Sequence, residues 1–131
     1  MKVSLIIAVY KDVEALHLIF KSLKNQTYEN FEVVVAEDGE SEVMLEAIAF
    51  AKNKYSFEII HVRQEDNGVR KSCSQNNGIK ASSGEYLIFI DGDCLLYSTF
   101  IRKSCSTCRE KKYSNWTTSK CWSTVFDATK K

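Results

Sequence analysis

The sequence predicts an α/β domain with a mostly parallel sheet flanked by helices. Four apolar runs rich in β-branched residues alternate with segments of helical spacing, and the connections between them are short. This alternation is typical of βαβ units joined by right-handed crossovers. Two of the apolar runs lead into acidic residues, and ligands of such sheets bind beyond the carboxyl ends of the strands.

The first strand is expected at Val3–Val9, because a near-continuous apolar stretch is typical of a parallel strand covered on both faces. Asp12 is suited to cap a first helix, which keeps helical spacing up to Asn25. Phe31–Ala36 is the second expected strand. Ser41 then begins a second helix, with apolar side chains along one face.

The third strand is expected at Phe57–Val62 and the fourth at Glu85–Ile90. Between them, Arg70–Ser82 has helical spacing but only a thin apolar face. After Phe100 the sequence shows no repeated helical or strand period. The regular alternation of strands and helices therefore ends at this point of the chain.

The charge distribution changes where the periodicity ends. The net charge is +1, but residues 1–101 carry 10 basic and 15 acidic side chains, whereas residues 102–131 carry 8 basic and 2 acidic ones. We therefore expect one α/β domain over 1–101, followed by an atypical basic tail rich in Ser, Thr and Cys over 102–131. Neither part has the clustered basic and aromatic residues of a nucleic-acid-binding protein, so no nucleic acid partner is expected.

Length and composition narrow the class of protein further. A chain of 131 residues with 44% hydrophobic residues is long enough for one domain with its own core. The longest apolar run, Leu5–Tyr10, is too short to cross a bilayer. No secretory signal precedes it, and five cysteines without framework spacing do not suggest a disulfide-stapled module. The expected location is the cytoplasm.

The segment Asp91-Gly92-Asp93 is the strongest candidate for a metal site. On extended backbone, side chains two residues apart point to the same side, so both carboxylates can face one cation. The glycine between them allows a bulky ligand to approach the backbone closely. Mg²⁺ and Mn²⁺ favour such oxygen ligands together with phosphate oxygens. The alternative is an ordinary turn after a buried strand.

Other polar residues follow the remaining strands. Glu37 and Asp38 end the second strand, where a carboxylate can accept a hydrogen bond from a base or a ribose hydroxyl; the alternative is a turn that caps the second helix. Arg70 and Lys71 can offset diphosphate charge, or lie on a solvated helix face. Asn76 and Asn77 are either sugar contacts or surface residues.

The order of these motifs resembles the nucleotide-binding half of family 2 glycosyltransferases, which have the Rossmann-like GT-A nucleotide-diphospho-sugar transferase fold. The resemblance covers residues 2 to about 101, so the C-terminal half of that fold would be incomplete. The matching segments are Ile6–Lys11, Ser22–Tyr28, Phe31–Val35, Glu37-Asp38-Gly39, Gln64–Lys71, Asn76-x-Gly78, Ala81–Tyr86 and Asp91–Cys94. The last of these and Gln64–Lys71 are similar to a bacterial subgroup that acts on surface polysaccharides.

The resemblance implies a nucleotide-sugar donor, most often a UDP-sugar, and Mg²⁺ or Mn²⁺ as the cofactor. Asp38 would bind the uracil edge, and Asp91 and Asp93 would be the metal ligands. The full set of implied substrate-binding residues is Ala8, Val9, Tyr10, Glu37, Asp38, Arg70, Lys71, Asn76, Asp91 and Gly92. Gln75 departs from the family pattern, which often has arginine there, so Arg70 or Lys71 would have to supply that charge.

The resemblance also implies inverting transfer of the sugar to a glycan acceptor, with peripheral association at the inner face of the membrane as one setting. Such enzymes use a carboxylate base that follows the metal motif. Here Glu110 and Asp127 are the only acids past residue 102, in no matching context. We therefore expect a frameshift or truncation shortly after Ile101. The alternative to an enzyme is a non-catalytic nucleotide-sugar-binding module or an inactive remnant.

Two further classes fit less well. A phosphate-receiver domain would need acids after the first strand, a lone aspartate after the third and a lysine after the last. Here the first strand ends in Ala-Val-Tyr and the third in Val-Arg-Gln, which do not fit. A zinc site formed by Cys105, Cys108 and Cys121 would lack the paired ligand sets typical of zinc, since both histidines lie far upstream.

Overall fold

The computed structural model describes residues 2–65, 68, 71–92, 95–103, 113–118 and 121–127. The four predicted strands lie within one residue of β1 to β4. The elements, in chain order, are β1 (Val3–Val9), α1 (Val13–Lys24), β2 (Phe31–Glu37), α2 (Glu42–Lys54), β3 (Glu58–Arg63), α3 (Lys71–Ala81), β4 (Tyr86–Asp91), β5 (Tyr113–Thr118) and β6 (Cys121–Asp127).

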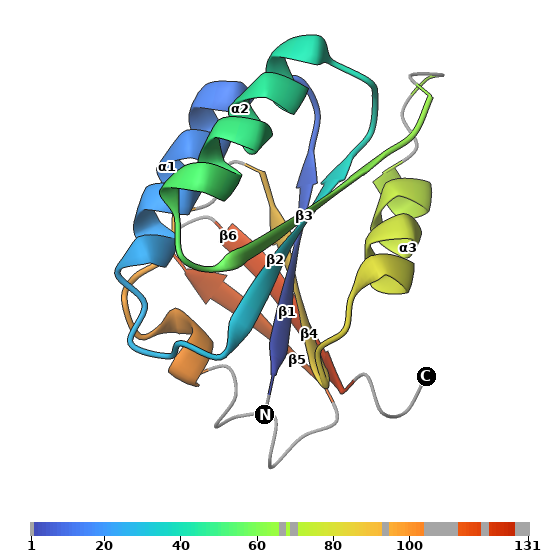
Figure 1. The fold of residues 1–131 in the computed structure, drawn as a ribbon. Coiled ribbons are helices and arrows are strands. Elements are labelled where there is room, and N and C mark those ends of the chain that lie inside the picture. The colour runs from blue at the N-terminus through green and yellow to red at the C-terminus, as the bar shows by residue number, and fades with distance from the viewer. Residues whose placement is uncertain are drawn as a thin grey trace.

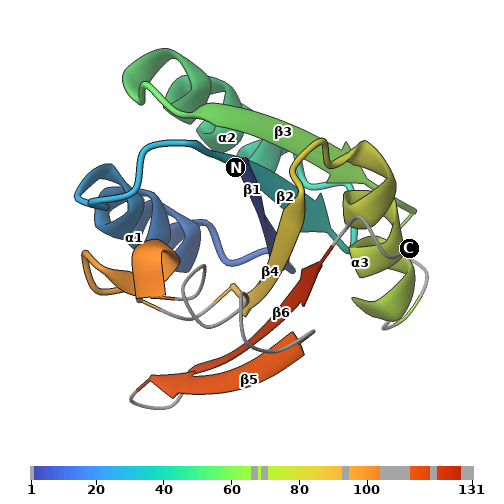
Figure 2. The same cartoon turned by 90° about the horizontal axis from the view of Figure 1, so that it is seen from below.

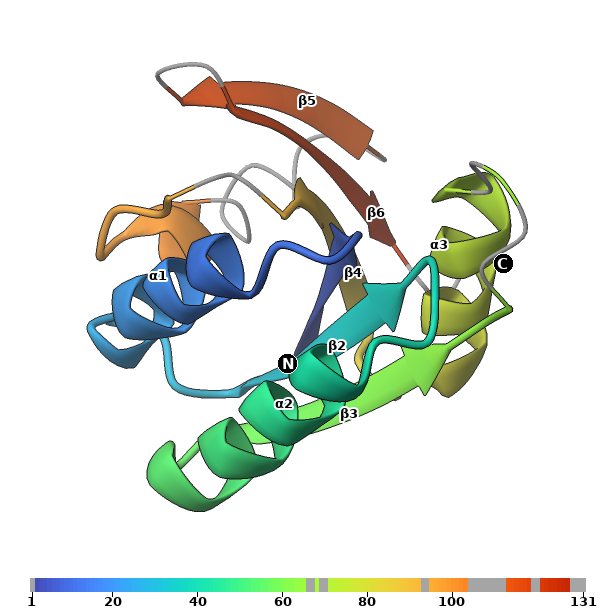
Figure 3. The ribbon, with the colours of Figure 1, turned by 90° about the horizontal axis from the view of Figure 1, so that it is seen from above.

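The strands form one sheet in the order β3-β2-β1-β4-β6-β5. Strands β1 to β4 are parallel, as predicted, whereas β6 is antiparallel to both of its neighbours. Helices α1 and α2 cover one face and α3 covers the other (Figures 1 and 3). The crossover through α3 carries the chain back past β1 to β4. The winding direction therefore reverses beside β1, which is where open α/β sheets bind ligands.

Strands β5 and β6 were not predicted, because the sequence shows no strand period after Phe100. In the structure β6 pairs with β4 and β5 pairs with β6, so the sheet continues beyond β4 (Figure 2). These segments are rich in Thr, Trp, Tyr and Val, which favour strands. They lack the long apolar run that identifies a parallel strand covered on both faces, and this explains why they were missed.

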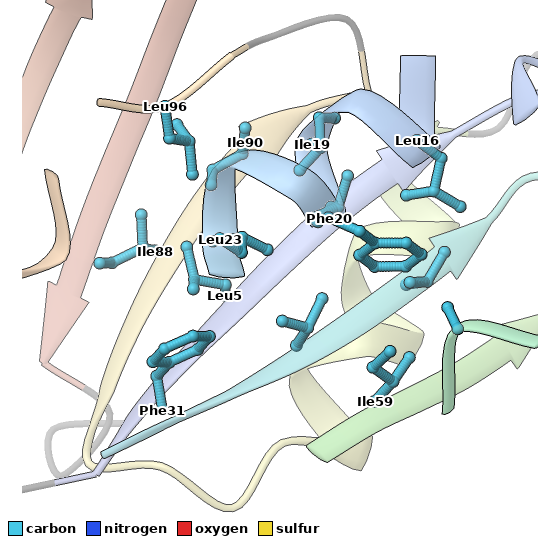
Figure 4. Packing of buried hydrophobic residues seen from close by; sticks show 14 of the residues in the cluster. Leu5, Leu16, Ile19, Phe20, Leu23, Phe31, Ile59, Ile88, Ile90 and Leu96 are labelled. Atoms are coloured by element: carbon cyan, nitrogen blue, oxygen red, sulfur yellow. The ribbon is translucent and has the colours of Figure 1, made fainter. Parts of the chain in front are cut away.

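Side chains of β1 alternate between two apolar clusters, because successive residues of a strand point to opposite faces. Leu5 and Ile7 pack with α1 and α2, whereas Ile6 packs on the side of α3. Figure 4 shows the larger cluster, where Phe20 of α1 lies above the sheet and Ile59 of β3 lies near its edge. Full burial of each such side chain contributes about 1.5–3 kcal/mol to the free energy of folding. Because β1 supplies side chains to both clusters, this central strand organises the core.

Both predicted helix caps are present. The side chain of Asp12 accepts a hydrogen bond from the backbone N–H of Ala15, and that of Ser41 accepts one from Met44. Each cap satisfies one of the backbone N–H groups that a helix start leaves without a partner. In the part of the chain that the structure describes, no helix is long and apolar enough to cross a bilayer.

The chain that follows the predicted metal motif is fastened to the end of α1 by Gln26. Its amide nitrogen donates to the carbonyl of Tyr97 at 2.8 Å, and its amide oxygen accepts from the backbone N–H of Ile101 at 3.2 Å. The backbone N–H of Thr27 also donates to the carbonyl of Ser98 at 2.9 Å. Residues 95–103 are thereby held against the loop between α1 and β2.

A buried polar cluster lies at the opposite end of the sheet from the carboxyl ends of the parallel strands. The Glu32 carboxylate accepts from the Ser4 hydroxyl and from both the backbone N–H and the hydroxyl of Ser83, and it pairs with Lys2 at 3.1 Å. Burial alone would raise the pKa of Glu32, but these hydrogen bonds outweigh it and lower the pKa below its ordinary value. The cluster joins the starts of β1, β2 and β4.

We expect Gly84→Ala to destabilise the domain by about 1–3 kcal/mol. A Cβ atom on Gly84 would lie 2.7 Å from the backbone nitrogen of Ser4 and 2.9 Å from the carbonyl carbon of Val3, so the start of β1 would have to move. Urea denaturation measures the loss, with the exposed Ser56→Ala as the control. A free energy of unfolding within about 0.5 kcal/mol of the wild type would contradict the close packing.

We expect Glu32→Gln to lower the free energy of unfolding near neutral pH by about 2 kcal/mol, since it weakens charge-assisted hydrogen bonds. The folded-state pKa of Glu32 is lowered. Its contribution is therefore fully present above the unfolded-state pKa of about 4.3 and is lost as the pH falls through the folded-state pKa. Denaturation at a series of acidic pH values should show a shallower loss of stability in Glu32→Gln. The exposed Glu29→Gln is the control, and equal pH dependence in all three proteins would refute the role of Glu32.

Candidate functional site

Strand register brings the carboxyl ends of β1, β2 and β4 level with one another. Ala8 of β1 pairs with Ala36 of β2 on one side and with Asp91 of β4 on the other. Val9 pairs with Glu37. Because neighbouring strands are about 4.8 Å apart, the acidic ends of β2 and β4 lie roughly 10 Å apart on either side of β1.

Asp38 connects β1, β3 and α3 through a chain of hydrogen bonds. Its backbone N–H donates to the carbonyl of Val9 at 3.0 Å. Its Oδ1 accepts from Nε2 of Gln64, just after β3, at 2.7 Å. The Oε1 of Gln64 in turn accepts from Nδ2 of Asn77 on α3 at 3.2 Å. We call these three side chains the Asp38–Gln64–Asn77 network; it places a carboxylate at the end of β2 on the side covered by α3.

Glu37 is buried on the other side of the sheet. Its Oε2 accepts from the backbone N–H of Ser41 at 2.8 Å, and its Oε1 lies 2.8 Å from Nε2 of His61 and 3.5 Å from Nε of Arg63. Burial lowers the pKa of His61 and outweighs the opposing effect of the Glu37 carboxylate. The contacts of Glu37 are those of a turn that leads into α2, which was the alternative interpretation of this acidic pair.

Gly92 packs directly against the end of β1. A Cβ atom here would lie 2.7 Å from the carbonyl oxygen of Ala8 and 3.2 Å from Cγ1 of Val9. The sequence suggested that this glycine admits a ligand, but the close approach seen in the structure is to the backbone of β1. Asp91 is the last residue of β4, and its side chain and Asp93 lie outside what the structure describes.

The chain leaves β1 through an unusual backbone conformation. Val9 is buried, whereas the side chain of Tyr10 is half exposed and the ammonium of Lys11 lies 5.1 Å from the centroid of its ring. Lys11 has a φ of 59°, in the left-handed region. Such a conformation costs about 1–3 kcal/mol in a residue other than glycine, and it is found preferentially at functional sites.

Helix α3 presents its two adjacent asparagines differently. Asn76, the predicted sugar contact, is exposed, whereas Asn77 is partly buried and belongs to the Asp38–Gln64–Asn77 network. Lys71 is the first residue of α3, but its side chain and Arg70 lie outside the described residues. The structure therefore gathers Ala8, Val9, Asp38 and the backbone of Asp91 at one sheet edge and leaves Asn76 at the surface.

Sequence reasoning assigned no role to Gln64 and considered Asn77 only as a sugar contact or a surface residue. A signal for Gln64 was present, because it is a polar residue that follows a strand end, like the acidic residues selected after the second and fourth strands. The sequence drew attention to Asn77 but not to its hydrogen bond with Gln64, since that contact depends on how α3 packs against the sheet. His61 was passed over because it lies inside an apolar strand.

Within the described residues, no group of three His, Cys, Asp or Glu side chains gathers to hold a metal. This finding does not apply to the predicted pair Asp91 and Asp93, because the side chain of Asp91 and all of Asp93 lie outside the described residues. The donor chemistry of this pair suits Mg²⁺ or Mn²⁺, which complete their coordination with phosphate and water oxygens. Gly92 fits as well, because its contact with Ala8 fixes the backbone between the two carboxylates.

Two solved structures with bound nucleotides have a similar architecture. TarS 1-349 of S. aureus in complex with UDP aligns with a TM-score of 0.68 and 24% identity, over 88% of this chain and 34% of that one. The mannosyltransferase PcManGT from Pyrobaculum calidifontis, in complex with GDP-Man and Mn²⁺, aligns with a TM-score of 0.68 and 18% identity, over 82% of this chain and 31% of that one. These alignments support the GT-A fold predicted from the sequence.

A closer relative is a protein of Rickettsia bellii named "Uncharacterized glycosyltransferase", which is 40% identical over 96 residues. The alignment covers 73% of this chain but only 13% of that protein, so the chain spans a small part of the length of this relative. The model of glycosyl transferase family 2 matches residues 4–114. The chain therefore belongs to glycosyl transferase family 2.

Proposed function

We propose that this chain binds a nucleotide-sugar donor, most simply a UDP-sugar, for transfer of the sugar to a glycan acceptor. The observation that carries the proposal is the register that sets Ala8 between the carboxyl ends of β2 and β4. A nucleoside diphosphate can extend across β1 from a base at Asp38 to a diphosphate near Asp91, because the two ends are roughly 10 Å apart. This crevice is the usual ligand position in such sheets.

The base would lie at the end of β2. An ionised carboxylate only accepts hydrogen bonds, so Asp38 suits the N3–H of uracil, with the backbone of Ala8, Val9 and Tyr10 lining the pocket. Glu37 would contribute indirectly by fixing the turn that follows, through its hydrogen bond from Ser41. Asp38 is only 7% exposed, so this hydrogen bond would be largely shielded from water.

The diphosphate would lie at the end of β4. Asp91 and Asp93 would hold Mn²⁺ or Mg²⁺, and Arg70 and Lys71 would offset the remaining charge. The bound cation would supply stabilisation of the negative charge that builds on the diphosphate as the bond to the sugar breaks. Gly92 would keep the two carboxylates at a fixed distance from the base pocket.

Transfer with inversion requires a base that deprotonates the acceptor hydroxyl. None of the residues gathered at this sheet edge is suited to that role, since Asp38 would be engaged by the donor and Glu37 is buried with His61. We therefore assign donor binding to this chain. Surface polysaccharide synthesis at the inner face of the membrane is the setting proposed for it, on the similarity of Gln64–Lys71 and Asp91–Cys94 to a bacterial subgroup. The second candidate is a nucleotide-sugar-binding module without transfer activity.

Calorimetric titration of UDP into the purified chain, with and without Mn²⁺, tests the donor site. We expect binding that strengthens with Mn²⁺ and an Mn²⁺ effect that is lost in Asp93→Ala, since one of two carboxylate ligands is removed. The exposed Glu29→Ala should bind like the wild type. A cooperatively folded wild-type protein that binds no UDP would refute the proposal. Transfer or hydrolysis of a UDP-sugar would distinguish an enzyme from a binding module.

Gly92→Ala should weaken Mn²⁺-dependent UDP binding roughly tenfold or more, because small displacements of binding groups are costly. Its added Cβ would meet the carbonyl oxygen of Ala8 at 2.7 Å and push the metal motif away from β1. UDP binding without Mn²⁺ should change much less. Circular dichroism and urea denaturation establish that the variant is folded. Wild-type affinity in the folded variant would show that the contact with Ala8 does not position the motif.

A further inference from the structure

The central residue of the Asp38–Gln64–Asn77 network is Gln64, to which the resemblance to the family assigns no role. Gln64 follows β3 and lies between the carboxylate of Asp38, at 2.7 Å, and the amide of Asn77, at 3.2 Å. Asp38 directly follows β2, and Asn77 belongs to α3. Three segments that are distant in the sequence therefore meet at this one amide.

The chemistry of the network fixes the orientation of the Gln64 amide. An ionised carboxylate cannot donate, so the group facing Asp38 has to be the NH₂ of Gln64. The oxygen of Gln64 then faces Asn77, whose NH₂ donates to it. The Asp38 carboxylate therefore selects the orientation of Gln64, and Asn77 complements it by turning its NH₂ toward the Gln64 oxygen. A reversed Gln64 amide would set an oxygen against the carboxylate.

We propose that Gln64, held by Asn77, keeps the Asp38 carboxylate in the position from which it accepts the N3–H of uracil. Gln64 is then a specificity-determining residue, which favours uridine nucleotides over cytidine nucleotides. The proposal rests on the proposed function. A carboxylate can accept about four hydrogen bonds, so a bond from Gln64 is compatible with one from a base. Cytosine has no hydrogen on N3, and its ring nitrogen is an acceptor that would face the carboxylate unfavourably. Discrimination requires that the carboxylate stays in place.

The test compares the affinities of UDP and CDP, measured by calorimetry with Mn²⁺ present, in the wild type and in Gln64→Met. Methionine keeps the length of the side chain and removes both hydrogen bonds. We expect UDP binding to weaken roughly five- to tenfold, the effect of about one hydrogen bond, with CDP binding nearly unchanged. The preference for UDP should therefore shrink, which a general loss of stability would not cause.

Two further variants and one control sharpen the result. Asn77→Ala leaves Gln64 in place without its anchor and should reduce the preference for UDP in the same direction by a smaller factor. Gln64→Glu sets a second carboxylate against Asp38 and should weaken UDP binding more than Gln64→Met, because like charges repel. Asn53→Ala removes an exposed amide near the end of α2, whose side chain donates to Ala49, and should change neither affinity.

The outcomes separate the two proposals. A wild type that binds UDP no better than CDP would overturn the uracil site and the role of Gln64 together. A wild-type preference for UDP that is lost in Asp38→Asn but retained in Gln64→Met and Gln64→Glu would overturn only the role of Gln64. Equal weakening of UDP and CDP in the Gln64 variants would also overturn it, because the residue would then support the fold and not the choice of base.

Discussion

Parallel pairing of β1 with β2 on one side and β4 on the other determines where every other part of the domain lies. A residue of β1 has fixed partners in both neighbours, so Ala8 sets the position of Ala36 and of Asp91 at once. The same strand divides the core, with Leu5 and Ile6 pointing into separate apolar clusters beneath different helices. A shift of one residue in this pairing would exchange the two faces of a strand and separate the acidic ends, so fold and site share one constraint.

Polar residues occupy both ends of the parallel strands, but they are arranged for different purposes. At the amino ends, Glu32 is fully buried and accepts hydrogen bonds from Ser4 and Ser83. That arrangement satisfies a buried charge within the protein, and it stabilises the starts of three strands. At the carboxyl ends, the carboxylate of Asp38 and the glycine between Asp91 and Asp93 lie at an edge where donors and charge from a ligand can be added. The first cluster joins strands to one another, and the second joins Asp38 to the segment after β3 and to α3.

The sequence was sufficient to predict those parts of the fold that depend on local pattern. Continuous apolar runs identified β1 to β4, and the capping roles of Asp12 and Ser41 followed from residue type and position. Strands β5 and β6 were missed because their β-propensity is not accompanied by an apolar run, and only pairing with β4 reveals them. Of the site, the strand-end acids could be predicted from the rule for parallel sheets. The hydrogen bonds that join Gln64 to Asp38 and Asn77 could not, since they are contacts between elements, which no spacing along the chain encodes.

The adjacent acids Glu37 and Asp38 show why residue type alone does not assign a role. Alternation along β2 sends their side chains to opposite faces of the sheet. Glu37 therefore points toward α2, where Ser41 and His61 surround it in the protein interior. Asp38 lies on the side of α3, where its Oδ1 accepts a hydrogen bond from the amide of Gln64. Residue type alone does not distinguish the two carboxylates, whereas the sheet makes Glu37 an acceptor within the turn that leads into α2 and places Asp38 in the Asp38–Gln64–Asn77 network.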